Sequence, residues 1–246
     1  MSRTHRWVTG RRAVAEAVRA GLADEVVVGT WVRTTPGLRD VLQAARDAGV
    51  PVREAPRSTL DGIDPEHQGV AVRIATPREL NEGQLAEHPF GADDVVVILD
   101  GITDPQNLGA AARSAEVAGG AMLVTRIRRS AGLTPAAVRA SAGALSHLPV
   151  ARVTNLRRTI DALKGRGFTV VGLDADGPSI ADESCPDGPV ALVVGAEGTG
   201  ISRLVREGCD LLVSLPMRGR VGSLNASAAL AAALYAYVLP SRERRG

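Results

Sequence analysis

The chain has 246 residues, of which 45% are hydrophobic and 23% charged, and its formal net charge is +2. This length can bury one large or two ordinary cores, and the composition is typical of a soluble α/β protein rather than a disordered or fibrous one. The longest apolar run, residues 228–239, is too short to cross a bilayer, and no signal-peptide pattern opens the chain. We therefore expect a cytoplasmic protein with no membrane partner.

A few residue types narrow the possible functions further. Only 2% of residues are aromatic, which argues against aromatic stacking platforms for single-stranded nucleic acid. Lys164 is the only lysine, and the many arginines suit phosphate binding, although a GC-rich coding bias would enrich arginine equally well. Cys185 and Cys209 lack metal-ligand spacing and the histidines are scattered, so we expect neither a disulfide framework nor a metal site.

Residues 1–76 predict a small α/β domain. Apolar residues at helical spacing follow Gly10 and end at Gly21, and a second such pattern covers residues 38–48. Residues 77–92 are polar and contain proline and glycine, which predicts a linker with a short turn or helix. Strands in this part are expected over residues 25–28, 50–52 and 70–74.

Residues 93–246 alternate between strands and helices throughout. This alternation predicts a second α/β domain with a mostly parallel sheet and helices on both faces. Strands are expected over residues 94–99, 121–124, 149–153, 169–173, 190–194 and 211–215, and helices over residues 108–119, 135–145, 155–164, 201–207 and 225–238.

Three stretches place polar side chains where a strand is followed by a helix, which is where open sheets bind ligands. The first is LDGITDPQNLGAAARSAEVAG, residues 99–119, with Asn107 at the start of a helix and Arg113 within it. Taken alone, this stretch also fits an asparagine-capped helix with an exposed arginine.

The second stretch is VVGAEGTGISRL, residues 193–204, where Glu197 stands among glycines. Its spacing matches neither the dinucleotide fingerprint nor a phosphate-binding P-loop, so its backbone could meet an uncharged base such as adenine, or the turn could be purely structural. The third is SLPMRGRVGSLNASAALAAALYAY, residues 214–237, in which Ser223 and Asn225 lie near the start of an alanine-rich helix. Helix capping is the simpler interpretation of that pair.

Together and in this order, the three stretches resemble the motifs of the SpoU (TrmH-like) branch of the SPOUT RNA methyltransferases. The resemblance rests on N-x-G-x-x-x-R at residues 107–113, G-x-E-G-x-G at 195–200, and L-P-M followed by S-L-N-A-S within 215–227. GRRAVAEAV and HQGVAV, in the first 76 residues, resemble the substrate-binding domain of this family. The match is closest to the RlmB type, the 23S rRNA guanosine 2′-O-methyltransferases, notably in LPVARVTNL at residues 148–156.

The resemblance implies a fold and a cofactor that periodicity alone does not predict. Family membership implies a C-terminal SPOUT domain with a trefoil knot, S-adenosylmethionine bound in the knot loops, and an N-terminal domain that binds RNA rather than DNA. It also implies a homodimer with Asn107 and Arg113 at the interface. Cofactor contacts are implied for Gly195, Leu215 and Leu224, with Met217 and Ile201 as neighbours.

The implied reaction places a ribose 2′-oxygen in line with a methyl–sulfonium bond while its proton is removed. Arg113 matches the residue often given the role of base in this family, but a guanidinium stays protonated in proteins. We therefore expect Arg113 to hold the RNA phosphate or the developing oxyanion, with the proton leaving through that phosphate or a water. We expect Asn107 to orient Arg113 or the ribose. Glu197 is expected to fix the loop or the incoming nucleotide. Ser223 and Asn225 are expected to form hydrogen bonds with the knot loops and with the target.

Other functions stay open on the sequence alone. A non-catalytic RNA-binding relative would keep the fold, although this chain retains the motif residues. A nucleotide-dependent oxidoreductase would fit the alternation but requires a G-x-G-x-x-G turn, which is missing. Within the methyltransferases, tRNA is the second substrate candidate, and 23S rRNA enzymes that confer antibiotic resistance share the architecture. The sequence does not show which nucleotide is methylated, because RNA of this kind is recognised largely by its shape and its loops.

Overall fold

The computed structural model describes residues 6–74, 77–220 and 222–243. It divides into two compact units, Met1–Thr76 and Pro77–Gly246, each with its own hydrophobic core. The residues at the junction itself, 75–76, lie outside the described part. In the described ranges, no helix is long and apolar enough to cross a membrane.

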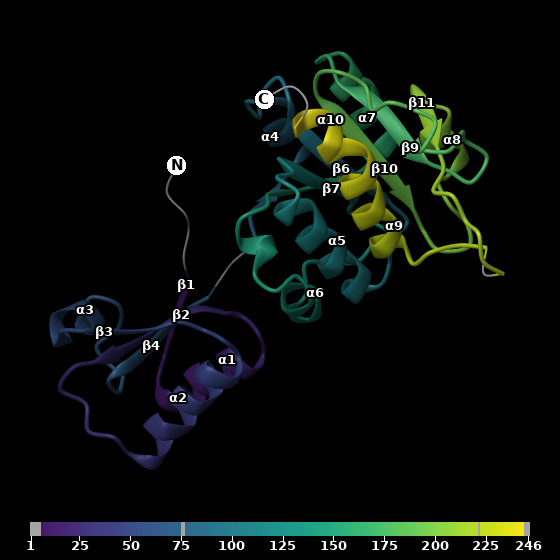
Figure 1. Cartoon of the computed structure of the whole chain (residues 1–246). Helices are drawn as coiled ribbons and strands as arrows, with labels where there is room; N and C mark the ends of the chain where they lie inside the picture. The colour runs from purple at the N-terminus through teal and green to yellow at the C-terminus, as the bar shows by residue number, and fades with distance from the viewer. Residues whose placement is uncertain (1–5, 75–76, 221, 244–246) are drawn as a thin grey trace. The chain divides into compact units, whose positions relative to one another are not determined.

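The first unit is a small mixed sheet with helices on both faces (Figure 1). Its elements are β1 (Arg6–Thr9), α1 (Arg11–Arg19), β2 (Ala23–Gly29), α2 (Pro36–Asp47), β3 (Val52–Ala55), α3 (Arg57–Asp61) and β4 (Val70–Ile74). The strand order is β1-β4-β2-β3, with β2 antiparallel to β4 and parallel to β3. Because side chains alternate along a strand, Val26 packs with α1 and α2, whereas Val27 packs with Leu60 of α3.

Two short elements of this unit have no periodic signal in the sequence, and one strand begins later in the chain than the sequence predicts. β1 and α3 have four and five residues, too few for a pattern to develop. The strand expected over residues 50–52 begins instead at Val52. Gly49 has a left-handed φ of 66°, and Pro51 has no N–H to donate to β2, so regular pairing starts only after them.

The second unit is a seven-stranded sheet in which every neighbouring pair of strands is parallel, as the sequence predicts. Its elements are β5 (Glu79–Leu80), α4 (Glu82–Ala86), β6 (Val95–Asp100), α5 (Pro105–Val117), β7 (Met122–Arg126), α6 (Pro135–Ala140), η1 (Ala144–Ser146), β8 (Val150–Val153), α7 (Leu156–Lys164), β9 (Thr169–Leu173), β10 (Val190–Gly195), α8 (Arg203–Arg206), β11 (Leu211–Val213), α9 (Ala226–Ala233), η2 (Leu234–Val238) and α10 (Leu239–Glu243). The strand order is β11-β9-β10-β6-β7-β8-β5. Helices cover both faces, with α5 against α6 and α9, and α7 against α8 (Figure 1).

Two helices end differently from their predicted bounds. The helix expected over residues 135–145 ends at Ala140, because Ala142 and Gly143 take left-handed φ angles of 48° and 91°. The last helix, expected over residues 225–238, continues through the π-helical turn η2 into α10.

Residues 77–92, which resemble a linker in the sequence, are folded onto the second unit. β5 pairs with β8, and α4 begins with a capping box of Asn81 and Gln84. Glu82 accepts hydrogen bonds from the hydroxyl and the backbone N–H of Thr154 and pairs with Arg158. The Thr154 hydroxyl is the main reason why the pKa of Glu82 falls to about 2. These contacts join the stretch to the sheet.

The loops after β6, β10 and β11 all lie at the carboxyl ends of the strands, because every strand of this sheet runs in the same direction. Gly195, which ends β10, lies in register with Asp100, which ends β6. The order of the strands reverses direction between these two, which is the point where open α/β sheets bind ligands.

Candidate active site

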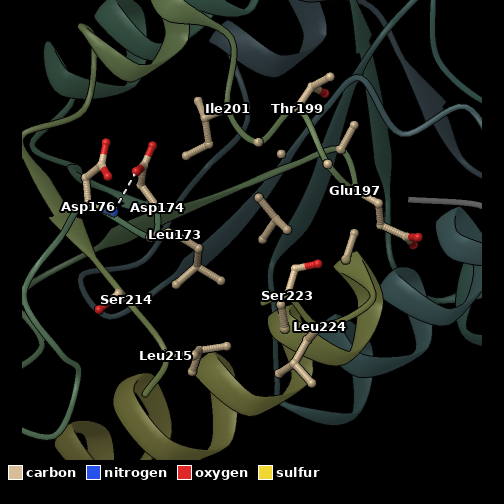
Figure 2. Close-up of a pocket in the computed structure, with 18 of the residues that line it drawn as sticks. Leu173, Asp174, Asp176, Glu197, Thr199, Ile201, Ser214, Leu215, Ser223 and Leu224 are labelled. Atoms are coloured by element: carbon tan, nitrogen blue, oxygen red, sulfur yellow. Dashed lines mark hydrogen bonds between the residues drawn. The ribbon is translucent and has the colours of Figure 1, made fainter. Parts of the chain in front are cut away.

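A cleft of about 1060 Å³ opens at the carboxyl ends of these strands (Figure 2). Its walls are the loop after β9, the loop between β10 and α8, and the loop between β11 and α9. Figure 2 shows Thr199 and Ile201 on one side of the cleft and Leu215 and Leu224 on the other. All five residues expected at a cofactor line it, namely Gly195, Ile201, Leu215, Met217 and Leu224.

The turn after β10 crosses directly over Gly195. A Cβ on this residue would lie 2.0 Å from the carbonyl carbon of Gly200 and 2.3 Å from the backbone nitrogen of Ile201. Gly198 and Gly200 have φ angles of 78° and 65°, which glycine adopts without strain. The glycine pattern therefore builds a tight turn whose main chain, rather than side chains, forms part of the cleft wall.

A buried ion pair holds this turn against the sheet. The carboxylate of Asp100, which is 3% exposed, contacts Arg126 Nη2 at 2.9 Å and accepts a hydrogen bond from Ser202 N at 2.7 Å. Arg126 also donates to Ser202 Oγ at 3.2 Å. Neither Asp100 nor Arg126 is among the site residues expected from the sequence. The available signal was an acidic residue at the end of a strand that is otherwise apolar.

One residue from each of the three motif stretches meets the others beside the cleft. Asn107 Nδ2 donates to Glu197 Oε1 at 3.0 Å. Asn225 Nδ2 donates to the same Oε1 at 2.6 Å and to Asn107 Oδ1 at 2.8 Å. We call Asn107, Glu197 and Asn225 the amide–carboxylate cluster. Glu197 lines the cleft, and its second oxygen, Oε2, accepts no hydrogen bond from the described residues.

Asn225 has two roles in this arrangement. Its Oδ1 accepts from Ser227 N at 2.9 Å and from Ala228 N at 3.3 Å, so it caps α9. Its Nδ2 makes the two cluster contacts, so both ends of the amide are used. The structure therefore confirms Asn225 as the cap of α9 and also places it in the cluster, whereas its role in catalysis stays a prediction.

Asn225→Asp should separate these two roles. Aspartate caps a helix as well as asparagine does, so thermal stability should change little. Its second oxygen would face two acceptors, Glu197 Oε1 and Asn107 Oδ1, and repel both. We expect methyl transfer, measured as kcat, to fall by about 100-fold, the scale of losing one oriented donor. Asn225→Ser is the comparison variant, because it keeps a cap and removes the same Nδ2 donor without adding charge, so any further loss in Asn225→Asp comes from charge repulsion. If Asn225→Asp keeps wild-type kcat, the residue serves only as a cap.

The other two expected catalytic residues lie apart from the cluster. Ser223 lines the cleft next to Leu224 (Figure 2). Arg113 is exposed on α5, and its position six residues after Asn107 turns it roughly 120° around the helix axis. It does not line the cleft and makes no hydrogen bond or ion pair with any residue that the structure describes.

One end of the cleft carries acidic residues that the sequence analysis did not select. Asp174 and Asp176 follow β9 and line the cleft, and both pair with Arg206 of α8, at 2.9 and 3.1 Å. These pairs tie the loop after β9 to α8. Within the described ranges, no group of three or more His, Cys, Asp or Glu side chains is placed to hold a metal ion.

Comparison with known proteins identifies the family. The SpoU rRNA Methylase family matches residues 94–235, and the family described as RNA 2′-O ribose methyltransferase substrate binding matches residues 7–80. The chain belongs to the SpoU rRNA methylase family. A SpoU enzyme of this kind transfers a methyl group to the ribose 2′-hydroxyl of RNA, and its N-terminal unit binds the RNA substrate. The oxidoreductase alternative is thereby excluded.

Individual relatives match this chain over nearly its whole length. YacO of Bacillus subtilis (strain 168), assigned to the TrmH family of tRNA/rRNA methyltransferases, is 39% identical over 241 residues, 96% of each chain. An uncharacterized tRNA/rRNA methyltransferase of Mycobacterium sp. (strain KMS) is 44% identical over 230 residues, 90% of this chain and 72% of that protein. The SpoU methyltransferase AviRb from Streptomyces viridochromogenes, in complex with AdoMet, is similar with a TM-score of 0.63 and 28% identity, covering 98% of this chain and 91% of that one.

Proposed function

We propose that this SpoU enzyme methylates the 2′-hydroxyl of a guanosine in 23S rRNA, an activity of the RlmB type, and acts as a homodimer. The observation that most strongly supports methyl transfer at the cleft is the amide–carboxylate cluster beside it. Its members come from three distant parts of the chain. Solvent-exposed hydrogen bonds add little net stability, so their convergence here points to a ligand rather than to the fold.

S-adenosylmethionine is the methyl donor, and the residues of the cleft fit it. Ile201, Leu215 and Leu224 offer apolar walls, and the turn over Gly195 offers backbone donors and acceptors for an uncharged base. When bound, the donor supplies a methyl group on a positively charged sulfonium. The cleft, at about 1060 Å³, is at the upper end of ligand pockets, which leaves room for the target nucleoside beside the donor.

The chain must then orient the ribose and accommodate its proton. Glu197 Oε1 is occupied by two amides, so Oε2 is fixed in place and free to accept a hydrogen bond from the incoming nucleotide. Ser223, which lines the cleft, supplies a second polar group near the donor. An oriented hydroxyl held in line with the methyl group gains the rate advantage of proximity, and its proton leaves through the RNA phosphate or a water.

Arg113 does not line the cleft of its own chain. In a twofold dimer the Arg113 of each protomer reaches the cleft of the other, where its guanidinium holds the RNA phosphate or the developing oxyanion. Arg113→Ala and Arg113→Lys should then both lower kcat by about 100-fold or more, since lysine has no bidentate fork. Substantial rescue by lysine would instead support a simple charge or base role.

Mixed dimers test whether Arg113 acts on the partner's cleft. Arg113→Ala and Glu197→Gln chains, each inactive alone, are unfolded together and refolded. If Arg113 acts across the interface, each mixed dimer has one intact site, and about a quarter of wild-type activity returns. If Arg113 acts within its own chain, or if the protein is a monomer, no activity returns. Sedimentation of the wild-type chain shows independently whether the protein is a dimer in solution.

The choice of 23S rRNA rests on the N-terminal unit. The substrate-binding family covers residues 7–80, so the chain carries a folded RNA-binding module in addition to its methyltransferase unit. Such a module suits a large RNA that is recognised by its shape. Labelled S-adenosylmethionine, offered with unmodified 23S rRNA and unmodified tRNA separately, tests this choice. Label at a guanosine of 23S rRNA supports the proposal, and label only in tRNA contradicts it.

We also infer a trefoil knot near the C-terminus. Ser214 donates to Pro178 O at 2.7 Å and accepts from Ile180 N at 2.9 Å, so the segment after β11 lies beside the loop that follows β9. Tyr237 Oη donates to Ser184 O at 3.1 Å, which brings η2 to the same loop. Stretching the chain from both ends should leave it shorter than its full contour length, and recovery of the full length would exclude the knot.

A further inference from the structure

The first unit contains a second cleft, of about 660 Å³, that takes no part in the proposed reaction. It lies where the loop after β2, the start of α1 and the turn before β4 meet. We call it the Trp31 cleft. The lining residues that matter to its chemistry are Arg11, Trp31, Arg33, Arg57, Glu66 and His67.

Trp31 is the most unusual residue of this cleft. Its side chain is 39% exposed, and its indole N–H has no hydrogen-bond partner in the described part of the chain. The ring lies over Gly29, where a Cβ would stand 2.4 Å from Cη2, so the glycine permits this position. An aromatic ring that is held against backbone and keeps part of its surface in solvent is available to contact a ligand.

His67 holds the indole from the side. The imidazole is buried, and its Nδ1 accepts from Gly69 N at 2.7 Å, so Nε2 carries the hydrogen and donates to Asp61 Oδ1 at 3.0 Å. The rings of Trp31 and His67 meet edge to face, with centroids 5.8 Å apart and planes at 82°. Since both imidazole nitrogens are bonded, the indole is oriented before a ligand binds, which lowers the entropic cost of binding.

Arginine dominates the charge of the cleft. Arg33 is exposed and has no partner among the described residues. The Arg57 guanidinium lies over the indole ring, 6.0 Å from its centroid and so at the outer limit of a cation–π contact, and it pairs only loosely with Asp61, at 3.8 Å. With Arg11 these make three positive groups in the lining, against the single carboxylate of Glu66. A flat apolar face beside several guanidinium groups matches a nucleotide, which combines a base with a phosphate.

We propose that the Trp31 cleft binds an unpaired nucleotide of the RNA substrate, with its base stacked on the Trp31 indole and its phosphate held by Arg33 and Arg57. Unpaired bases are the parts of RNA that stack on aromatic rings, whereas a continuous duplex keeps its bases inside. An acidic peptide would satisfy the arginines but would leave the indole face unused. That the ligand is RNA rests on the proposed function, whereas the stacking arrangement rests on the cleft itself.

Trp31→Ala should weaken binding of the full chain to the RNA it methylates by roughly 5- to 150-fold, the loss expected when one stacked base loses its ring. Trp31→Phe should retain most of the affinity. The KM for RNA should rise with the Kd, while kcat at saturating RNA and the affinity for S-adenosylmethionine stay at wild-type values. Arg33→Ala should reduce the salt dependence of RNA binding by the amount expected for about one lost phosphate contact. Arg46 is an exposed arginine on α2 outside the cleft, so Arg46→Ala should leave this salt dependence unchanged.

Fluorescence provides a readout that does not depend on methyl transfer. The chain has two tryptophans, so Trp7→Phe leaves Trp31 as the remaining one. Single-stranded oligoadenylate should quench its emission, and a blunt RNA duplex should not. Wild-type RNA affinity in Trp31→Ala, or no quenching by oligoadenylate, would overturn the proposal. If the wild-type chain methylates no RNA at all, the proposed function fails, while quenching by oligoadenylate still decides the Trp31 cleft.

Discussion

Gly195→Ala is expected to weaken binding of S-adenosylmethionine strongly and to lower methyl transfer with it. The added Cβ would lie 2.0 Å from the carbonyl carbon of Gly200 and 2.2 Å from its oxygen, and neither atom belongs to a flexible side chain. The turn over residues 196–201 must therefore move, and Ile201 and Glu197 move with it. A loss of about 3 kcal/mol, the upper range for overpacking, corresponds to roughly 100-fold weaker donor binding. Equilibrium titration with the donor measures this effect.

Gly219→Ala is the matched control for this prediction. Gly219 lies in the loop between β11 and α9, has no positive φ, and an added Cβ would meet nothing within 4 Å. Its donor affinity and melting temperature should stay at wild-type values. Tight donor binding in Gly195→Ala would show that the cleft at the end of β10 is not the donor site.

Glu197→Gln is expected to stop methyl transfer while the donor still binds. A glutamine carbonyl can accept the amides of Asn107 and Asn225, so the cluster and the turn are preserved. The free acceptor at Oε2 becomes an NH₂ donor, which cannot accept a hydrogen bond from the nucleotide. We expect kcat to fall by about 100-fold or more, as when one oriented polar group is removed from an active site. Single-turnover transfer at saturating RNA measures the change.

Glu87→Gln serves as the control, because Glu87 is an exposed carboxylate at the end of α4 that does not line the cleft. The donor Kd should be the same in both variants and in the wild type. If Glu197→Gln turns over at the wild-type rate, Oε2 has no role in catalysis, and Glu197 only supports the turn.

The parallel sheet could be predicted because its signals are local. Apolar runs such as residues 95–100 alternate with amphipathic helices such as α7, and each is visible within a short window. The order of the strands is not local, and neither is the attachment of residues 77–92. That attachment depends on the contacts of Glu82 with Thr154 and Arg158, more than 70 positions away.

The candidate site could be predicted only as separate stretches and through a family resemblance. Asn107 and Asn225 each fit a helix start, and nothing in their local sequence shows that they share Glu197. The pairing of Asp100 with Arg126 could not be predicted, because an ion pair between two strands leaves no pattern in the sequence beyond the acidic residue at the end of an apolar strand. The Trp31 cleft was not expected from the sequence, because the low aromatic content argues against a stacking platform and the residues that line the cleft are spread over positions 11 to 69.

The central claim is transfer of a methyl group to a ribose 2′-oxygen, and the chemical form of the product tests it most directly. RNA labelled by the wild-type chain from labelled S-adenosylmethionine is hydrolysed in alkali, which cleaves RNA only next to a free 2′-hydroxyl. Label recovered in an alkali-resistant dinucleotide that contains 2′-O-methylguanosine is the predicted result, and Gly195→Ala should yield far less of it at the same donor concentration. Label recovered in mononucleotides with a methylated base would contradict the account.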